Sequence, residues 1–413
     1  MSRLDELINE YCPDGVKFYK LGELGKFYGG ITGKSKEDFI DGNAKFITYT
    51  NVYANPALNI DVDDRVKIGT DEKQRTLAYG DVIFTGSSET PNECGISSVV
   101  TKNTNEKLYL NSFCFVFRFD NPDCILPDFA KHLFRSTNLR YQIGKTANGV
   151  TRYNISKKLM EKVVIPIPPL EVQEEIVRIL DSFTELTAEL TAELTARKKQ
   201  YEYYREHLIV EAEGTYGKLI DLLSQPITDG PHTTPKLVYE GIPFVSATAI
   251  WHGKVHFEKA QGFITEEADS EYSKKYKPRR NDVFMVKSGS TTGKVAIVDT
   301  DKNFNIWSPI AAMRTDNEIT ARYIYHLLQT SSVQNMVLTR MSHGSQPNLS
   351  MRVLEQFDVK ILTLQEQERI IKILDRFDTL CNDISAGLPA EIEARQKQYE
   401  YYRDKLLTFK EMS

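Results

Sequence analysis

Several short segments of this 413-residue chain resemble parts of catalytic sites, but none is complete. GSTTGKV (289–295) resembles a phosphate-binding loop, yet three residues instead of four separate its glycines, and Val295 stands where Ser or Thr should hold magnesium. HGKVH (252–256) spaces two histidines four apart but lacks the glutamate of a zinc protease. An adenine-methylating enzyme would need an NPPY-type tetrad, and the nearest string is NPAL (55–58). We therefore predict no catalytic residue, no metal site and no cofactor.

The chain repeats one plan of nearly 200 residues. KQYEYYR occurs at 199–205 and again at 397–403, an offset of 198. Upstream, VQEEIVRILDSFTEL (172–186) pairs with EQERIIKILDRFDTL (366–380) at an offset of 194, and weaker matches stay in the same order. This period is far too long for a solenoid, whose repeats run about 20 to 50 residues. We predict a duplicated domain whose copies share a scaffold and differ between the matched segments.

Bulk composition narrows the class of protein. No apolar run approaches the roughly 18 residues of a membrane span, and the polar start MSRLDELINE does not resemble a signal peptide, so we expect a cytoplasmic protein. Five cysteines without CxxC spacing fit a reducing compartment. Residues 166–213 carry 5 Lys and Arg against 11 Asp and Glu, whereas 1–165 carry 22 against 21 and 214–358 carry 16 against 15. Neutral halves neither require nor exclude nucleic-acid binding, because a basic face matters more than a basic total.

The segment after IPIPPL (165–170) has the pattern of one long helix. TAEL stands there twice, no Gly or Pro occurs from 170 to 213, and apolar residues recur with the spacing of one helical face at Ile176, Leu180, Phe183, Leu186, Leu190 and Leu194. We predict about 40 residues of continuous helix. In the second copy Gly387 and Pro389 interrupt the corresponding segment, so that helix should be kinked or split.

Each predicted helix carries an apolar stripe that it cannot bury alone. Two related stripes can pair antiparallel as a coiled-coil-like spacer. The alternative is that each helix packs on its own globular half. We favour the spacer, because a helix of this length overhangs a domain of about 160 residues.

The order of these segments resembles the specificity subunit of a type I restriction-modification system. The first half ends in PIPPLxxQxxIVxILDxF (166–183), a helix with TAEL tetrads follows, and the chain closes with GLPxEIxxRQKQYEYYRDxL (387–406). Segments 16–39 and 229–246 resemble the starts of that family's two target-recognition domains. The resemblance covers essentially the whole chain, and the KQYEYYR ends and TAEL tetrads are its most specific parts.

The resemblance implies an α/β (α+β) fold with two target-recognition domains, at 1–165 and 214–358, and spacer helices at 166–213 and 359–413. In that family each domain reads one half of a split DNA sequence. Because the two variable halves differ here, the whole target should be asymmetric. One TAEL unit adds ~6 Å of helix, comparable with one or two base-pair steps, so the tetrad number should tune the gap between half-sites.

The resemblance also implies partners. Besides double-stranded DNA, we expect methyltransferase (modification) subunits, two of them, and ATP-dependent restriction subunits. The tyrosines of the heptapeptides are candidate anchors for the methyltransferase, with packing inside the chain as the equal alternative: Tyr201, Tyr204, Tyr399 and Tyr402. The competing hypothesis for the whole chain is a solitary nuclease or methyltransferase with an unrecognised catalytic site.

Loops rich in Gly, Ser, Thr and Asn supply the candidates for DNA contact. Base edges are read by polar side chains on exposed loops, and phosphates are held by cations and backbone amides. Ordinary surface turns have the same composition, so the alternative is that these loops are surface turns without a role in DNA binding. A basic run at 274–280 is a further candidate face, with a solvated loop as its alternative. The candidate DNA-binding residues are Lys34, Lys36, Ser87, Ser88, Arg152, Tyr153, Thr233, Thr234, Lys236, Ser290, Thr291, Lys294 and Gln346.

Overall fold

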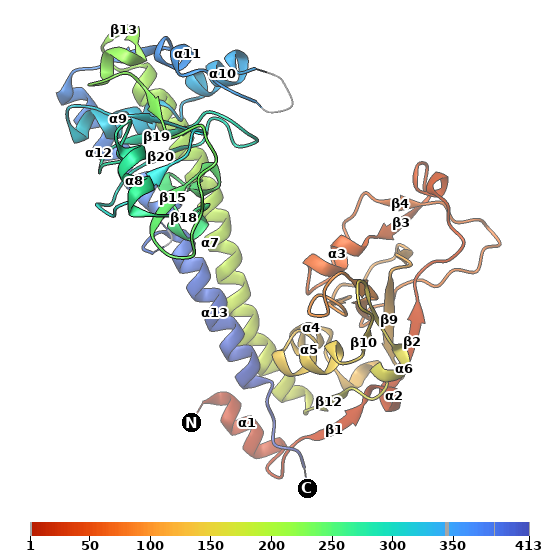
Figure 1. Cartoon of the computed structure of the whole chain (residues 1–413). Helices are drawn as coiled ribbons and strands as arrows, with labels where there is room; N and C mark the ends of the chain where they lie inside the picture. The colour runs from red at the N-terminus through yellow and green to blue at the C-terminus, as the bar shows by residue number, and fades with distance from the viewer. Residues whose placement is uncertain (1, 343–346, 384, 413) are drawn as a thin grey trace. The chain divides into compact units, whose positions relative to one another are not determined.

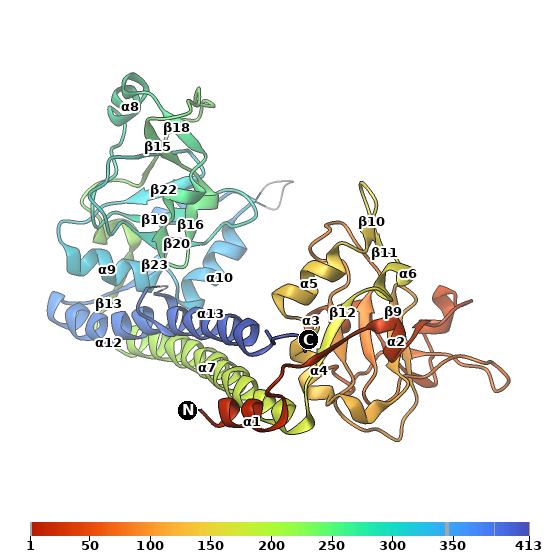
Figure 2. The same ribbon diagram turned by 90° about the horizontal axis from the view of Figure 1, so that it is seen from below.

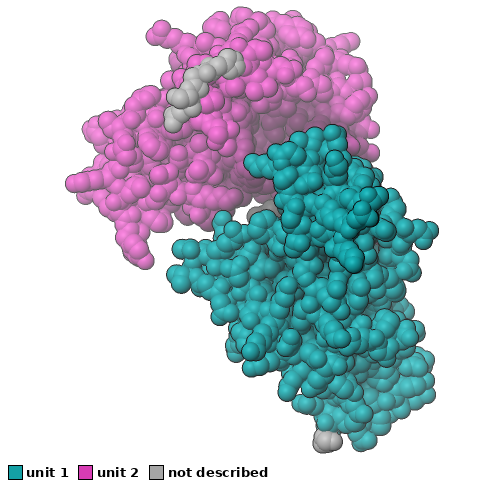
Figure 3. Space-filling model, turned by 90° about the vertical axis from the view of Figure 1, so that its right-hand side faces the viewer, with its two compact units in different colours: residues 1–188, 393–413 teal, residues 189–392 magenta. Residues whose placement is uncertain are grey.

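A computed structural model describes residues 2–342, 347–383 and 385–412 of the chain. It is a mixed α/β structure that divides into two compact units (Figure 3). Unit 1 comprises residues 1–188 and 393–413, and unit 2 comprises residues 189–392. Both divisions fall inside a helix, so each unit combines a globular part with pieces of two helices. The predicted fold class, a duplicated α/β plan with a long helix, is confirmed.

The strands of unit 1 form one central antiparallel sheet and three smaller sheets. The small sheets include one parallel pair, β3 with β8, while the other pairs are antiparallel. The central sheet has the order β2 (Gly25–Gly29), β9 (Cys114–Phe119), β5 (Val82–Thr85), β7 (Ser97–Val99). The others are β4 (Arg65–Val66), β3 (Ala44–Ile47), β8 (Leu108–Leu110); β10 (Ala147–Asn148), β11 (Tyr153–Ile155), β6 (Ser87–Ser88); and β1 (Lys17–Lys20), β12 (Val164–Ile167).

Unit 2 repeats this topology. Its central sheet has the order β14 (Thr228–Asp229), β22 (Ile310–Met313), β19 (Val283–Val286), β20 (Val295–Ile297). A second sheet again contains one parallel pair, β15 with β21. The smaller sheets are β18 (Gly262–Ile264), β15 (Ile242–Val245), β21 (Asn305–Ile306); β13 (Thr215–Lys218), β23 (Asp358–Ile361); and the hairpin β16 (Ile250–Trp251), β17 (Lys254–Val255).

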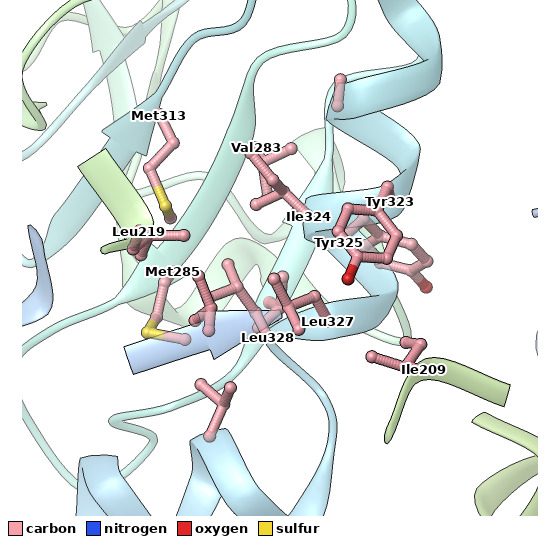
Figure 4. Packing of buried hydrophobic residues seen from close by; sticks show 14 of the residues in the cluster. Ile209, Leu219, Val283, Met285, Met313, Tyr323, Ile324, Tyr325, Leu327 and Leu328 are labelled. Carbon is pink, nitrogen blue, oxygen red and sulfur yellow. The ribbon is translucent and has the colours of Figure 1, made fainter. Parts of the chain in front are cut away.

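The central strand of each unit is buried on both faces. Alternate residues of a strand point to opposite faces, so a run of four apolar residues feeds two cores. In unit 2, Val283 and Met285 belong to one apolar cluster, and Phe284 and Val286 belong to another. Figure 4 shows the first of these clusters, with Leu327 and Leu328 near Met285. In unit 1, Phe84 and Ile83 likewise enter separate clusters.

Helices cover the sheets in the same order in both units. A short helix pair follows each central sheet: α4 (Pro127–Leu133) and α5 (Thr137–Gly144) in unit 1, α9 (Glu318–Leu327) and α10 (Ser331–Arg340) in unit 2. Ser136 and Thr330 cap the second helix of each pair, where a side-chain oxygen accepts from an otherwise unpaired amide. The remaining short helices are α1 (Arg3–Tyr11), α2 (Leu21–Leu24), α3 (Tyr49–Ala54), α6 (Lys157–Met160), α8 (Glu266–Ser273) and α11 (Met351–Glu355).

The long helix α7 (Leu170–Val210) runs without interruption for 41 residues, which confirms the predicted continuous helix. The second copy is split, as predicted, into α12 (Leu364–Asn382) and α13 (Leu388–Leu406). The end of α13 lies antiparallel beside the start of α7 in unit 1, and α12 lies beside the later part of α7 in unit 2 (Figures 1 and 2). Val172 and Ile176 enter the core of unit 1, whereas Ile209 enters that of unit 2. The helices therefore both pair with each other and pack on globular parts.

Within the described residues, the helices lack the combination of length and apolar character that crossing a membrane requires.

Candidate nucleic-acid interface

Two of the predicted loops of unit 1 are joined by strand pairing. β6 pairs antiparallel with β11, with Tyr153 opposite Ser88 and Asn154 opposite Ser87. The Arg152 Nη2 donates a hydrogen bond to the Ser87 Oγ at 3.2 Å. The structure therefore brings Ser87, Ser88, Arg152 and Tyr153 together, although 65 residues separate the first serine from the arginine.

A hollow of about 1050 Å³ lies at this junction. The guanidinium of Arg152 lies 5.5 Å from the centroid of the Phe113 ring, and the ring is 56% exposed. Phe113 did not emerge from the sequence, because a single aromatic residue in a turn carries no periodic signal. An exposed ring beside a cation can stack on bases or sugars. The hollow is lined by Tyr49, Thr50, Tyr53, Ala54, Ser87, Ser88, Glu89, Glu93, Phe113, Thr151 and Arg152.

Glu93 supplies a negatively charged hydrogen-bond acceptor in the same hollow. Its carboxylate accepts from the hydroxyls of Thr90 at 2.9 Å, Tyr53 at 3.1 Å and Ser88 at 3.3 Å. These hydrogen bonds, first that of Thr90, lower the pKa of Glu93, so the carboxylate stays charged at neutral pH. The hollow thus offers an exposed acceptor in Glu93 and an exposed donor in Arg152, the pair of functions that base edges require.

The loop at 30–36 departs from its prediction in part. The Lys34 side chain is only 9% exposed and forms an ion pair with Glu72. This bond, together with others, lowers the pKa of Glu72 to about 2. Lys34 therefore stabilises the loop and is not a free cation for phosphate, a correction to the expected exposed side chain. Lys36 is exposed at the start of the 3-10 turn Lys36–Phe39.

Unit 2 repeats the strand junction of unit 1. Ser288 bridges Asn348 antiparallel, at the positions that correspond to Ser87 and Asn154. The Gly289 amide donates to the Pro347 carbonyl at 3.0 Å. This junction carries exposed Ser290 and half-buried Thr291, while Gln346 lies outside the described residues.

A buried carboxylate ties two predicted loops of unit 2 together. Asp229 is inaccessible to solvent and forms ion pairs with Lys275 and, at 3.3 Å, with Lys287, and the His232 Nε2 lies 3.2 Å from its carboxylate. Asp229 begins the predicted loop DGPHTTPK (229–236) and Lys287 begins the predicted loop KSGSTTGK (287–294), so their pairing fixes the bases of both loops. Thr233, Thr234 and Lys236 project from the first loop as exposed side chains.

Lys294 has a different environment from the other predicted contacts. Its Nζ lies 3.3 Å from the centroid of the Trp251 ring, a cation–π contact. Burial, followed by the nearby charge of Lys259, lowers the pKa of Lys294. Trp251 itself is 40% exposed on the β16–β17 hairpin.

The basic run of unit 2 is largely neutralised within the chain. Four of its cations form ion pairs with carboxylates: Lys274 with Glu271, Lys275 with Asp229, Lys277 with Asp269 and Arg280 with Asp301. These ion pairs favour the interpretation of residues 274–280 as a solvated segment that is paired within the chain over that of a free basic face.

The heptapeptide tyrosines divide into two classes. Tyr201 is only 4% exposed and Tyr399 is partly buried, because both pack against the cores of their units. These two rings therefore fit the alternative of packing inside the chain. Tyr204 and Tyr402 are each 39% exposed, and their neighbours Tyr203 and Tyr401 are more exposed.

Tyr201 and Tyr399 each complete a Tyr–His–Asp set of polar contacts, called a polar joint below, that occurs once in each unit. In unit 1 the Tyr399 hydroxyl lies 2.9 Å from the His132 Nδ1, and the His132 Nε2 lies 2.7 Å from Asp181. In unit 2 the Tyr201 hydroxyl lies 3.1 Å from the His326 Nδ1, and the His326 Nε2 lies 2.8 Å from Asp375. Each histidine is thus met by the heptapeptide of the opposite copy.

The described residues contain no group of three or more His, Cys, Asp and Glu arranged to hold a metal ion.

Comparisons with known proteins connect this architecture to one family. The family model described as "Type I restriction modification DNA specificity domain" matches residues 13–197 and 229–394. The chain is 38% identical over 267 residues to the type I restriction enzyme EcoR124I/EcoR124II specificity subunit of Escherichia coli, covering 62% of this chain and 65% of that relative. It is 35% identical over 275 residues to a putative type I restriction enzyme specificity subunit of Haemophilus influenzae, covering 63% and 68%.

Solved structures show the same fold. A crystal structure of a type I restriction-modification S subunit from M. genitalium matches with a TM-score of 0.53 at 13% identity, covering 95% of this chain and 96% of that one. A chain from a structure of the type I R-M system matches with a TM-score of 0.62 at 16% identity, covering 95% and 97%.

Proposed function

We propose, from the premise that this chain belongs to the family of type I restriction modification DNA specificity domains, that it is a non-catalytic DNA-recognition subunit. Each globular domain, 1–165 and 214–358, reads one half of a bipartite site. The observation that supports this best is the duplicated strand junction, Ser87 with Asn154 and Ser288 with Asn348. The same scaffold position carries different neighbouring side chains, Arg152 and Tyr153 in unit 1 and Ser290 and Thr291 in unit 2. Two different readers on one plan suit an asymmetric target.

In unit 1 the reading surface is the hollow around Arg152. A guanidinium can donate to both acceptors of guanine, and a carboxylate such as Glu93 can accept from the amino group of cytosine. Phe113 and Tyr49 add rings that can stack or contact a thymine methyl group. The hollow therefore favours a half-site with G·C base pairs.

In unit 2 the reading surface is the pair of loops held by Asp229. Their exposed tips carry hydroxyls and one cation, Thr233, Thr234, Lys236 and Ser290. Such side chains read bases less specifically than a bidentate arginine and also hold phosphates. Asp229 fixes the loop bases, which lowers the entropy lost when the loops bind DNA.

The helices set the gap between the half-sites. α7 is one continuous helix of 41 residues. Its length therefore changes when residues are inserted into the helix or deleted from it. One added TAEL unit lengthens it by ~6 Å and turns it by ~40° beyond a full turn. Half-sites on DNA must match the separation and rotational phase of their readers.

The partners are methyltransferase subunits, two per chain, with ATP-dependent restriction subunits completing a cytoplasmic complex. The half-exposed rings of Tyr204 and Tyr402 are the anchors for the methyltransferase, one on each helix. Each stacks on a phenylalanine of the neighbouring helix, Phe377 at 5.4 Å and Phe183 at 5.3 Å, which holds the ring in place for a partner.

The first experiment incubates the purified chain with DNA, magnesium and a methyl donor, alone and with its methyltransferase subunits. Methylation at one bipartite sequence only in the presence of the subunits is the expected result. Site-specific cleavage or methylation by the chain alone would contradict the proposal and favour a solitary enzyme.

The second experiment tests the spacer by inserting Thr-Ala-Glu-Leu after Leu194. Methylation mapping should show a longer gap between two unchanged half-sites. The matched control inserts the same four residues between Thr104 and Asn105, in an exposed loop of unit 1, and should leave the gap unchanged. Altered half-sites after the helix insertion would refute the spacer role.

A further inference from the structure

Unit 2 contains a hollow of about 390 Å³ whose lining does not include the loop-tip residues proposed above to read DNA, Thr233, Thr234, Lys236 and Ser290. Its wall includes Arg205 of the first heptapeptide, Trp251 of the β16–β17 hairpin, Lys294 and Gln329. None of the described residues that line it is acidic. The hollow is therefore a cationic site of the size that small ligands occupy.

Unit 1 fills the corresponding space with an arginine. Arg135 stands at the position that matches Gln329, 194 residues earlier. Its guanidinium donates to the carbonyls of Ser97 at 2.8 Å, Val52 at 3.3 Å and Tyr53 at 3.1 Å. Burial lowers the pKa of Arg135 to about 10, which fits a guanidinium enclosed by protein.

The residues around that guanidinium match the wall of the hollow. Register in the central sheets pairs Phe84 with Ser97 and Met285 with Val295, so Val295 corresponds to Ser97. Trp251 corresponds to Tyr53 at an offset of 198. Because Gln329 is shorter than arginine and uses its amide to donate to the Tyr325 carbonyl at 2.8 Å, the space stays open.

Arg205 differs from its counterpart Arg403 in that it does not pair with the carboxylate of the following residue. In unit 1, Arg403 donates to the adjacent Asp404 at 3.0 Å. In unit 2 the residue after Arg205 is Glu206, whose carboxylate accepts instead from the Ser331 amide at 2.7 Å. Among the described residues the Arg205 Nε has no hydrogen-bond partner although it is buried, and the Nη1 lies 3.5 Å from the Gln329 Oε1.

The guanidinium is nevertheless held in place. It lies 4.9 Å from the centroid of the buried Tyr201 ring. A buried donor without a partner costs roughly 1–3 kcal/mol, and more when the group is charged. Arg205 also lines the open hollow, and an oriented guanidinium in such a wall is the arrangement that an anion would complete.

Besides Arg205, two lysines lie beside the hollow, Lys294 and Lys259. Lys294 lines it, and Lys259 lies 5.4 Å from the same Trp251 ring. The nearby carboxylates are engaged elsewhere: Asp378 accepts from Tyr201, Tyr325 and Asn382, and Asp383 forms an ion pair with Lys254 at 3.3 Å. Two cations on separate elements suit a dianionic group with several oxygens better than a single carboxylate.

We propose that the hollow between Arg205, Trp251 and Lys294 is a binding site for a phosphate group. The guanidinium of Arg205 donates to the phosphate oxygens, and Lys294 leaves the face of Trp251 to neutralise the second charge. Free phosphate and the phosphodiester backbone of DNA share this chemistry. The site goes beyond sequence recognition, and its test does not depend on a specific DNA target.

Trp251 supplies the readout. The chain has two tryptophans, so Trp307→Phe leaves Trp251 as the only one. Inorganic phosphate, titrated at constant ionic strength with chloride, should change its emission in a saturable way, because the cation on its ring moves. Phosphorus-31 line broadening of inorganic phosphate on the unsubstituted chain provides the same measurement without the Trp307 change.

The variants then assign the site. Arg205→Gln and Lys294→Gln should each weaken phosphate binding at least about tenfold, the loss expected for one charge-assisted hydrogen bond. Lys274→Gln is the matched control, since Lys274 is exposed and contacts only Glu271 among the ion pairs of the described residues, and it should bind phosphate like the parent.

A duplex without the target sequence identifies the source of the phosphate. If the duplex changes Trp251 emission and inorganic phosphate competes, or if only the duplex acts and Arg205→Gln abolishes the effect, the phosphate belongs to the DNA backbone. If phosphate alone acts, the ligand is a free phosphate. Absence of any response to both, or equal responses in the parent and in Arg205→Gln, would overturn the proposal.

Discussion

Units 1 and 2 agree in their buried polar joints and differ at their exposed rims. The His–Asp distances are 2.7 and 2.8 Å, and the buried Asp–Arg pairs are both 2.6 Å. The rims instead present an arginine over a phenylalanine in one unit and threonine-rich loops in the other. A buried polar group tolerates no loss of its partner, whereas an exposed side chain can change freely. The two copies therefore share their buried polar contacts and differ in the exposed side chains proposed to read DNA. The matched joints are Asp81–Arg118 with Asp282–Arg314, and His132–Asp181–Tyr399 with His326–Asp375–Tyr201.

The largest expected effect tests whether the two Asp–Arg joints are equally important. Asp282→Asn should lower the unfolding free energy of unit 2 by about 3 kcal/mol or more, because it leaves a buried guanidinium uncompensated. Asp282 also accepts from the Arg279 amide and the Tyr276 hydroxyl. Asp81→Asn should cost less, about 1–2 kcal/mol, since the Arg118 side chain is 36% exposed against 18% for that of Arg314.

Urea unfolding separates the two units. Both tryptophans, Trp251 and Trp307, lie in unit 2, so their emission follows that unit while circular dichroism follows the whole chain. Asp301→Asn is the control, because Asp301 forms only an exposed pair with Arg280, and this variant should unfold like the parent. Equal losses for Asp81→Asn and Asp282→Asn would remove the difference between the joints.

The next effect concerns the rims. Arg152→Ala should weaken specific DNA binding by about 1–3 kcal/mol and relax preference at one position of a single half-site, because a bidentate base contact is lost. Lys236→Ala in unit 2 should weaken binding to all sequences alike and reduce the salt dependence by about one phosphate contact. Methylation mapping and fluorescence anisotropy at several salt concentrations distinguish the two. Relaxed preference in both half-sites after Arg152→Ala would contradict separate readers.

The scaffold was largely predictable from the sequence, and the site was not. Continuous helical periodicity from 170 onward and the Gly387–Pro389 interruption are local signals, so they gave the long and the split helix. The strand junction of β6 with β11 joins residues about 65 apart, and such pairing depends on the tertiary fold. Lys34 looked exposed in a Gly-rich loop, but Glu72, 38 residues away, neutralises it. No local pattern announces such a partner.

The tyrosines show the same limit. Two identical heptapeptides predict identical environments for Tyr201 and Tyr399, and both do meet a histidine. The sequence could not show that each meets the histidine of the opposite copy, because 125 and 267 residues separate the partners. Arg205 and Arg403 are likewise identical in sequence context up to the following residue, and that single difference between Glu206 and Asp404 changes their pairing.

A smaller effect distinguishes the two tyrosine joints. Tyr201→Phe should cost about 1–2 kcal/mol in unit 2, because its hydroxyl meets both His326 at 3.1 Å and Asp378 at 3.3 Å. Tyr399→Phe removes one hydrogen bond, to His132, and should cost about 1 kcal/mol in unit 1. Urea unfolding with the two signals measures both. Tyr401→Phe, at an exposed ring of the same helix, is the control that should change neither. A larger loss for Tyr399→Phe would reverse the ranking.

The smallest effect is a pH dependence that resides in unit 1. Burial lowers the pKa of His132 below its ordinary value of 6.5, against the opposing hydrogen bond to Asp181. The folded imidazole is then neutral, with Nε2–H donating to Asp181 and Nδ1 accepting from the Tyr399 hydroxyl. As pH falls below 6.5, the unfolded chain takes up a proton that the folded chain refuses, so this contribution to stability is lost until the lower folded pKa is passed. From pH 7 to 5.5 the loss should be at most about 1 kcal/mol. An NMR titration should place the His132 pKa below 6.5, and His132→Gln should flatten the pH dependence of unit 1 unfolding by that amount. Parallel curves for the parent and His132→Gln would contradict a titrating role for His132 and would leave the contact with Asp181 and Tyr399 as packing alone.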